Sequence, residues 1–320
     1  MKYKIISPLL LVVLLSSCQS STLIEDNIYA FDTFIDVKLF EGNEDDKTYL
    51  HNLITDYASY SDNYKAIANL NNVYTINSTN EEVEIDHRLY LMLKTAFTYH
   101  DFNADNFNPL CGSLSKRWKE ALKDNHVLDE ATVSSELNKI NNSSLLFKDN
   151  NIVQRVGEAE LDLGGVAKGY VLDEALGYLA LHGYKHYLIN AGSSSILLGE
   201  KDNKDGYFTV GIKDNVLPSS YLKLKNCFVS TSSISEQGVK IGDTTYSHII
   251  DPHTGSAINR QESIIVVTDK GYVGDILSTS LMNNTLEEIK EIEKAQGFKC
   301  IVINNKTITY KSEGLEVYKK

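Results

Sequence analysis

The stretch LDLGGVAKGYVLD, residues 161–173, constrains the fold more than any other part of this 320-residue chain. Two adjacent glycines, Gly164 and Gly165, stand between an apolar run and a segment with helical spacing of apolar side chains from Val166 to Leu179. Glycine lets the backbone turn sharply and lets a ligand approach it closely. The free N–H groups at a helix start favour anions. The pattern therefore predicts a glycine turn that opens a helix.

Two familiar phosphate-binding motifs do not match this turn. Lys168 is followed by Gly169, where a Walker loop requires Ser or Thr, and the dinucleotide spacing G-x-G-x-x-G is missing. The turn is therefore either an anion site of another kind or an ordinary strand-to-helix connection with a solvated lysine. These residues alone leave both interpretations open.

The charge of the chain argues against nucleic acid as a partner. The formal net charge is −12, whereas a general nucleic-acid binder needs a basic face. Hydrophobic residues make up 42% of the chain and charged residues 23%, which is typical of a globular protein. A local cationic or metal site for an anionic ligand remains compatible with this overall charge.

The first residues of the chain resemble a bacterial lipoprotein signal. Lys2 and Lys4 precede a short apolar run, and small residues then lead to Cys18 in the sequence LSSC. We expect residues 1–17 to be a signal peptide, Cys18 to carry lipid, and residues 18–28 to form a tether. The mature protein would then be an extracytoplasmic, membrane-anchored lipoprotein. The alternative is an ordinary secretory signal with an incidental cysteine.

The other cysteines do not indicate a disulfide framework. Cys111, Cys227 and Cys300 are odd in number and contain no close pair, so a Cys-x-x-Cys metal site is also absent from the sequence. One bridge is possible, but we expect small buried side chains.

The order of expected elements predicts an α+β fold in one mature domain, residues 29–320. Helices dominate the first half and strands the second, with one strand–helix unit between them. Expected helices cover residues 49–60, 86–100, 114–122, 166–179, 275–282 and 286–296. Expected strands cover residues 30–40, the hairpin 143–156, 186–199 with a glycine turn, 207–214, 227–235, 246–255, 300–304 and 307–312.

A histidine precedes a tight turn in the segment SHIIDPHTG, residues 247–255. Pro252 fixes its own φ, and Gly255 tolerates a positive φ. His248 stands at the expected end of the preceding strand and faces the loop. A histidine so placed is a candidate general base. A structural role for a lone histidine is the alternative.

The segment DILSTS, residues 275–280, places a carboxylate and a hydroxyl on one helix face. Asp275 and Thr279 are four residues apart. Such oxygen ligands suit a hard cation such as Mg²⁺. We expect Asp275 to be accessible to solvent, as metal-bound carboxylates usually are. The alternative is that Asp275 caps the helix and Thr279 faces solvent.

Taken together, these motifs resemble those of the ApbE family of FAD:protein FMN transferases. The resemblance rests on DLGGVAKGYVLD, NAGSS, STS, HIIDPHTG and DILSTS in this order, and it extends from about Phe31 to Met282. It implies two interleaved lobes with FAD and a metal between them. It also implies an enzyme that uses Mg²⁺ to move FMN from FAD to a Ser or Thr hydroxyl of an acceptor protein, with release of AMP.

The resemblance also assigns roles to individual residues. It implies FAD contacts at Asp162, Lys168, Phe31 and His248. It implies a metal site made of the Gly165 carbonyl and the side chains of Asp275 and Thr279, to which the backbone of Ser278 can add a ligand. His248 matches the family histidine that assists transfer.

The chain departs from the family pattern in segments that shape the FAD pocket. NAGSS, residues 190–194, stands where NAGGD is usual, so an acidic side chain is missing. Phe31-Asp32-Thr33 replaces an early MGT. FNADNFNPL, residues 102–110, is one residue longer than the family's FDxTxGPL and lacks its threonine.

Two alternatives to the transferase remain open, the second because of these departures. The first is an FAD pyrophosphatase that gives FMN and AMP, because only the nucleophile would differ. The second is a non-catalytic FAD-binding lipoprotein.

Overall fold

The computed structural model describes residues 22–102, 106–213, 215–234 and 238–320. The expected signal peptide and Cys18 lie outside the described residues, as does part of the segment FNADNFNPL. Within the described part of the chain, no helix is both long enough and apolar enough to cross a membrane.

Helices and strands are mixed in the first and last parts of the chain, whereas the described residues between 187 and 268 form strands and no helix. The strands are β1 (Thr22–Ala30), β2 (Thr33–Gly42), β3 (Glu82–Glu84), β4 (Ser144–Lys148), β5 (Ile152–Val156), β6 (Tyr187–Ala191), β7 (Ser195–Leu198), β8 (Phe208–Ile212), β9 (Ser220–Leu224), β10 (Cys227–Ser233), β11 (Val239–Ile241), β12 (Thr244–Tyr246), β13 (Ser263–Thr268), β14 (Lys299–Asn304), β15 (Thr307–Lys311) and β16 (Val317–Lys319). The helices are α1 (Glu44–Ser61), α2 (Val73–Asn77), α3 (His87–Phe102), α4 (Gly112–Lys123), α5 (Glu130–Asn141), α6 (Ala167–Leu181), α7 (Gly271–Ser280), the 3-10 helix η1 (Leu281–Asn283) and α8 (Leu286–Gln296).

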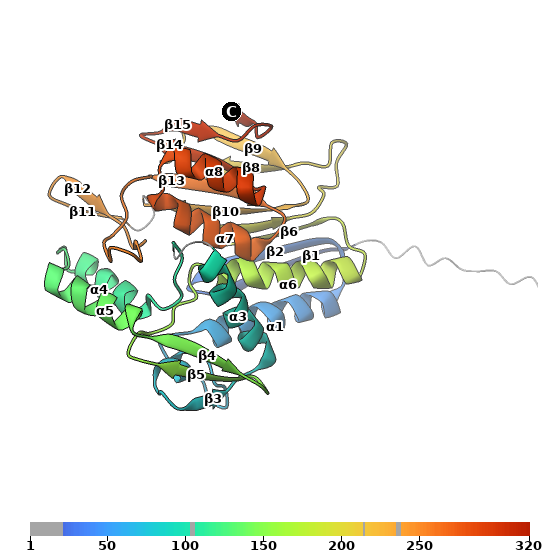
Figure 1. The fold of residues 1–320 in the computed structure, drawn as a ribbon. Coiled ribbons are helices and arrows are strands. Elements are labelled where there is room, and N and C mark those ends of the chain that lie inside the picture. Colours follow the sequence, from blue (N-terminus) through green and yellow to red (C-terminus); the bar gives the residue numbers. More distant parts are fainter. Residues whose placement is uncertain (1–21, 103–105, 214, 235–237) are drawn as a thin grey trace, which may run out of the picture.

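An eight-stranded sheet runs through the upper part of the molecule in Figure 1, in the order β1-β2-β6-β7-β10-β13-β14-β15. All of its neighbouring strands are antiparallel. Helices α1, α6 and α7 pack along one face of this sheet, and the small sheet β16-β9-β8 covers part of the other. The chain is therefore layered as helices, large sheet and small sheet.

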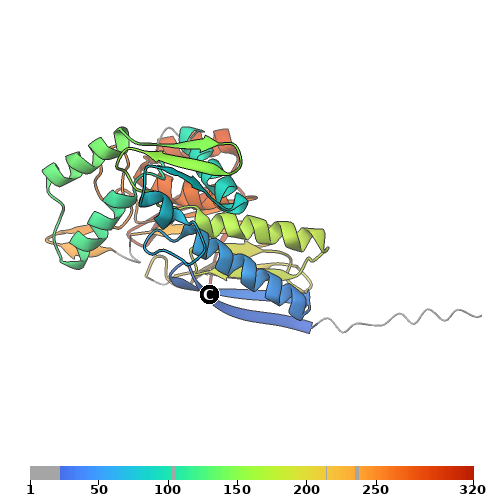
Figure 2. The same ribbon diagram turned by 90° about the horizontal axis from the view of Figure 1, so that it is seen from below.

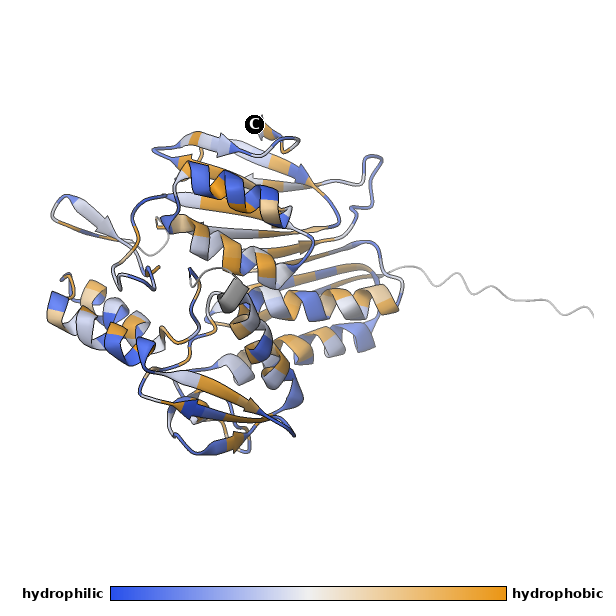
Figure 3. Cartoon of the chain, viewed as in Figure 1, coloured by the Kyte–Doolittle hydropathy of each residue, from blue (hydrophilic) through white to orange (hydrophobic). Residues whose placement is uncertain are grey.

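Strand β13 shows why the central strands are apolar on both sides. Ile264 and Val266 pack in one cluster with residues of α7 and α8, whereas Ile265 packs in another with residues of the small sheet. Successive side chains of a strand point to opposite faces, so a strand between two layers must be apolar throughout. In Figure 3 the hydrophobic segments accordingly run along the strands and the adjoining helices.

A second lobe is inserted between β2 and β6, which are neighbours in the large sheet. It contains α2 to α5 and the three-stranded sheet β3-β5-β4, which lies below α1 and α3 in Figure 1. Figure 2 shows α4 and α5 projecting at one end of the molecule. Strands from the start of the chain thus complete a sheet made mainly by its second half. The predicted α+β class is confirmed.

The start of the fold differs from the sequence prediction. Residues 22–28, expected in a tether, belong to β1, and the expected single strand over residues 30–40 is a hairpin. Its turn is Phe31 and Asp32, with φ of +52° and +55°. A two-residue hairpin turn requires positive φ and usually contains Asn or Gly. The sequence AFDTF lacks that signature, so the turn was missed.

Two expectations near the end of the chain are also corrected. The strand expected over residues 246–255 ends at Tyr246, and the following loop contains a bridge between Ile250 and Ala257. Helix α7 begins at Gly271, four residues before Asp275. Asp275 therefore lies inside the helix, and the interpretation that it caps the helix is wrong.

Candidate functional site

The glycine turn connects to α6 as predicted. Asp162 accepts a hydrogen bond from the backbone N–H of Gly164 through Oδ1 at 2.7 Å, which shapes the turn. A Cβ atom on Gly165 would lie 3.0 Å from the Phe107 ring and 3.8 Å from Oγ1 of Thr279. Gly165 thus brings its backbone close to the hydroxyl of Thr279, in a space that a side chain would fill.

Helices α6 and α7 approach each other so closely that their backbones touch. A Cβ atom on Gly169 or on Gly271 would overlap the carbonyl oxygen of the other residue. Asp173 of α6 accepts from the N–H groups of Gly271 at 2.9 Å and Tyr272 at 2.8 Å. In return, the N–H of Gly169 donates to Asp275 Oδ2 at 2.7 Å. Each helix therefore holds the first turn of the other.

Asp275 is the buried centre of this crossing. Its exposed fraction is only 5%, and Ser195 and Ser230 donate to its Oδ1, each at 2.7 Å. Burial raises the pKa of the Asp275 carboxyl, while the positive charge of Lys168 and the three hydrogen bonds oppose this shift. The expectation that Asp275 is accessible is wrong, because α7 packs directly on β7, β10 and β13.

Further hydroxyl groups surround the next turn of α7. Ser232 Oγ lies 3.0 Å from Ser278 Oγ and 3.3 Å from Thr279 Oγ1. Within the described residues, no group of three or more His, Cys, Asp or Glu gathers as a metal cluster. Carboxylate, hydroxyl and carbonyl oxygens are nevertheless the donors that Mg²⁺ prefers. The side chains of Asp275 and Thr279 with the backbone of Gly165 therefore fit a hard cation.

The loop that carries His248 is fixed at several points. Asp251 accepts from the Thr254 hydroxyl and from the Asn283 amide, both at 2.9 Å. The indole N–H of Trp118 donates to the carbonyl of Gly255 at 2.8 Å. His248 is half-buried, and the adjacent Ile249 packs in one cluster with residues of α7 and η1. The loop is thus held against the helix that carries Asp275 and Thr279.

Lys119 of α4 is a cation near the glycine turn that the sequence reasoning missed. Burial lowers the pKa of its amine, but a hydrogen bond with Tyr64 and the negative charges of Asp162 and Asp32 outweigh this effect and raise it. Its Nζ donates to the Tyr64 hydroxyl at 2.9 Å. The only sequence signal for this cation was the run of basic residues KRWK, and such a run is equally typical of a solvated helix face.

Cys111 connects the glycine turn with the loop of His248. Burial raises the pKa of its thiol to about 12, and the charges of Asp162 and Asp251 act in the same direction. Hydrogen bonds place the segment around Cys111 between them: the N–H of Asp162 donates to the carbonyl of Pro109 at 2.8 Å, and Trp118, on the helix that follows Cys111, donates to the carbonyl of Gly255 at 2.8 Å. The structure thus brings the segments of Asp162, Lys168, Asp275, Thr279 and His248 into one region.

The model of the ApbE family matches residues 31–302 of the chain. The chain belongs to the ApbE family.

Individual relatives agree with this assignment. Proteins named FAD:protein FMN transferase from Treponema pallidum and Klebsiella pneumoniae are 26% and 28% identical over 217 and 190 residues. These matches cover 62% and 57% of this chain, and they span 60% and 58% of the relatives' own lengths.

Solved structures of ApbE proteins share the fold. The one from Thermotoga maritima has a TM-score of 0.78 at 22% identity and covers 91% of this chain and 97% of its own. The flavin transferase ApbE from Vibrio cholerae has a TM-score of 0.71 at 18% identity, with coverage of 93% and 97%.

Two of the departures from the ApbE family pattern, at residues 31–33 and 190–194, map to turns that pack against each other. Gly192 and Ser193 have φ of +64° and +62°, and a Cβ atom on Gly192 would lie 2.5 Å from Thr33 Oγ1. The NAGSS turn therefore packs against the hairpin of Phe31 and Asp32. The Phe31 side chain is half-buried against the main core, whereas Asp32 is exposed and acts electrostatically on Lys119.

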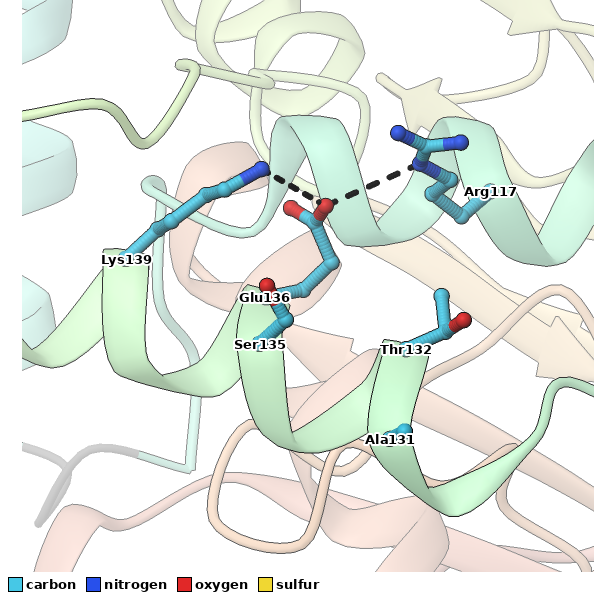
Figure 4. Close-up of a pocket in the computed structure, with 6 residues that line it drawn as sticks. All are labelled: Arg117, Ala131, Thr132, Ser135, Glu136 and Lys139. Atoms are coloured by element: carbon cyan, nitrogen blue, oxygen red, sulfur yellow. Dashed lines mark hydrogen bonds and ion pairs between the residues drawn. The ribbon is translucent and has the colours of Figure 1, made fainter.

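A cavity of about 350 Å³ between α4 and α5 contains none of the predicted site residues. Its wall includes Glu136, which is 2% exposed and accepts from Ser113 at 2.7 Å and from Lys139 at 2.9 Å. Arg117 Nε lies 3.6 Å from the same carboxylate (Figure 4). Burial raises the pKa of Glu136, but the hydrogen bonds and the two cations outweigh it and lower the pKa.

Proposed function

We propose that the chain is an FAD:protein FMN transferase. It would move FMN from FAD to a Ser or Thr hydroxyl of an acceptor protein and release AMP. The observation that carries this proposal is the convergence of the glycine turn, Lys168, Asp275 and Thr279 in a chain of the ApbE family. Relatives of the chain that are named FAD:protein FMN transferase support the same activity.

The metal of the proposed site is Mg²⁺, held by the Gly165 carbonyl, Asp275 and Thr279. The oxygen donors and the closeness of Gly165 to Thr279 support this assignment. Bound Mg²⁺ would supply neutralisation of the charge on the pyrophosphate of FAD.

The other predicted residues would bind FAD and move a proton. Asp162, Lys168, Phe31 and His248 would contact FAD, with Lys168 close enough to Asp275 to act on its charge. His248 would accept the proton of the acceptor hydroxyl as its oxygen forms a bond to the phosphorus of the FMN group. The bond between that phosphorus and the oxygen of AMP breaks, and AMP leaves with the electron pair.

Incubation with FAD, Mg²⁺ and an acceptor protein tests the proposal. We expect flavin covalently bound to the acceptor and an equal amount of AMP, measured by in-gel flavin fluorescence and chromatography. Free FMN with AMP, without labelled acceptor, would identify a pyrophosphatase. Neither product, with FAD still bound, would identify a flavin-binding lipoprotein.

We also propose that Cys18 carries the lipid that anchors the protein outside the cytoplasm. The sequence LSSC after a short apolar run supports this, with residues 1–17 as the signal peptide. Because β1 begins at Thr22, the remaining tether is short. Detergent-phase partitioning of the wild type and Cys18→Ser is the test, and equal partitioning would contradict lipidation.

A further inference from the structure

Asp275 is held by a pair of serines from two adjacent strands. Ser195 of β7 and Ser230 of β10 face each other directly in the antiparallel register. Both are buried, with exposed fractions of 2% and 1%, and both donate to Oδ1 of Asp275 at 2.7 Å. Two hydroxyls on neighbouring strands thus converge on one carboxylate oxygen of the facing helix.

The surroundings leave little room for another arrangement. A Cβ atom on Gly274 would lie 2.7 Å from Ser230 Oγ, so α7 sits directly on this hydroxyl. The other residues in the paired part of these strands are mostly apolar, including Ile196, Leu197, Phe228 and Val229. A hydroxyl buried here is costly unless it is hydrogen-bonded, and Asp275 is the group that accepts its hydrogen bond.

The hydrogen bonds determine which part of the carboxylate stays available. An ionised carboxylate has about four acceptor positions, two on each oxygen. The two serines occupy those of Oδ1, and the N–H of Gly169 occupies one on Oδ2 at 2.7 Å. One position therefore remains, and it belongs to Oδ2.

We propose that Ser195 and Ser230 are positioning residues that restrict Asp275 to binding a cation through Oδ2 alone and so select Mg²⁺ over Ca²⁺. The inference rests on the proposed function, which makes Asp275 a metal ligand. Mg²⁺ demands a compact octahedral shell and accepts single carboxylate oxygens, whereas Ca²⁺ takes more ligands and often both oxygens of a carboxylate. A carboxylate with one saturated oxygen suits the smaller ion.

Calorimetric titration of the full chain with MgCl₂ and with CaCl₂, without FAD, tests the proposal. We expect the wild type to bind Mg²⁺ more tightly than Ca²⁺. Ser195→Ala and Ser230→Ala should each weaken Mg²⁺ binding by about 10- to 100-fold, as removal of residues that orient metal ligands typically does. The ratio of Mg²⁺ affinity to Ca²⁺ affinity should fall in both variants, because Oδ1 of Asp275 becomes available to the cation.

Three further variants keep the test decisive. Ser220→Ala removes a hydroxyl that is equally buried, at 1% exposed, but donates to Pro218 in the small sheet, so it should bind both ions like the wild type. Ser195→Thr keeps a hydroxyl at this position and should retain Mg²⁺ binding. If an alanine variant does not fold, Ser195→Cys replaces the hydroxyl with a weak donor and should show an intermediate loss.

The outcomes separate this proposal from the proposed function. Wild-type Mg²⁺ affinity in both alanine variants, or equal binding of Mg²⁺ and Ca²⁺ by the wild type, would overturn the role of the serines. If FMN transfer is intact in the same experiment, the proposed transferase activity is still supported. If Mg²⁺ binding is selective and depends on the serines but no FMN is transferred to an acceptor, the positioning role of the serines is supported and the proposed transferase activity is contradicted.

Discussion

Two buried carboxylates of this chain, Asp275 and Glu136, are stabilised in opposite ways. Glu136 is met by two cations, Arg117 and Lys139, and its pKa is lowered. Among the described residues, Asp275 receives only neutral donors in direct contact, and burial raises its pKa in spite of the nearby charge of Lys168. Glu136 therefore has its counter-charge within the protein, whereas Asp275 lacks a cation in contact.

The difference separates these two carboxylates in their proposed roles, one structural and one metal-binding. Burying a charge costs free energy unless an opposite charge is paired with it. Removing one partner of a buried pair therefore leaves an uncompensated charge, which destabilises the fold. At Glu136 the protein supplies the pairing itself. At Asp275 no such pairing is present among the described residues, and our proposal therefore places the metal there and not in the cavity of Figure 4.

Asp275→Asn should have the largest effect on activity. The amide keeps the size of the side chain but removes its charge, so Mg²⁺-dependent transfer should fall by about a hundredfold or more. The amide oxygen still accepts from the serines, but the amide nitrogen then faces the N–H of Gly169, so a loss of stability of about 1–3 kcal/mol is expected as well, and transfer is compared per folded molecule. In-gel flavin fluorescence of an acceptor measures the rate, and a variant that transfers FMN at the wild-type rate would refute the assigned metal site.

His248→Ala separates the proposed base from the metal site. A positioned base contributes roughly 10²–10⁴-fold, so transfer should slow by this factor while Mg²⁺ and FAD still bind. FAD affinity is measured by fluorescence, and transfer as above. Equal losses of affinity and of rate would make His248 a pocket residue, and an unchanged rate would exclude it from the reaction.

Glu136→Gln tests the other side of the comparison. It leaves Arg117 and Lys139 without their carboxylate and should lower the free energy of unfolding by about 1–3 kcal/mol. The value is moderate because Arg117 and Lys139 remain 54% and 30% exposed to screening solvent. Denaturant unfolding gives the stability, and transfer per folded molecule should stay within about twofold. A large loss of transfer at full stability would place Glu136 in the active site.

Asp173 offers the smallest and most specific effect. Burial raises the pKa of this carboxyl to about 6 from a usual 3.8, against the hydrogen bonds from Tyr272 and Gly271. The folded state therefore holds the proton more tightly than the unfolded state, so stability falls as the pH rises from about 4 through 6. Asp173→Asn should remove this part of the pH dependence. An unchanged pH profile of the unfolding free energy would contradict the shift.

Local patterns predicted the elements but not their crossing. The spacing of apolar residues after Gly165 correctly placed α6, and the spacing of Asp275 and Thr279 correctly placed them on one helix face. The contact between Gly169 and Gly271 could not be predicted, because it joins residues about a hundred positions apart. Burial of Asp275 follows from that contact, so its accessibility was misjudged.

The two serines that donate to Asp275 lie in strands whose sequences resemble those of other core strands. Ser230 belongs to the STS motif of the resemblance, and Ser195 ends a run of three serines at the start of β7, but neither pattern indicates that the hydroxyl faces Asp275. Their convergence depends on the register of β7 and β10, which no local pattern specifies. The hairpin at Phe31 was missed for a different reason, since its residues adopt positive φ without the usual glycine or asparagine.

The central claim is that Asp275, which receives only neutral donors from the described residues, binds Mg²⁺, whereas Glu136, which is paired with two cations, does not. Thermal unfolding of the wild type, Asp275→Asn and Glu136→Gln, each with and without MgCl₂, tests it directly, because an ion that binds only the folded state raises the midpoint. We predict that Mg²⁺ raises the midpoint of the wild type and of Glu136→Gln by the same amount and leaves Asp275→Asn unchanged. The claim is contradicted if Mg²⁺ raises the unfolding midpoint of Asp275→Asn as much as that of the wild type, or if Glu136→Gln is the variant whose midpoint no longer responds to Mg²⁺.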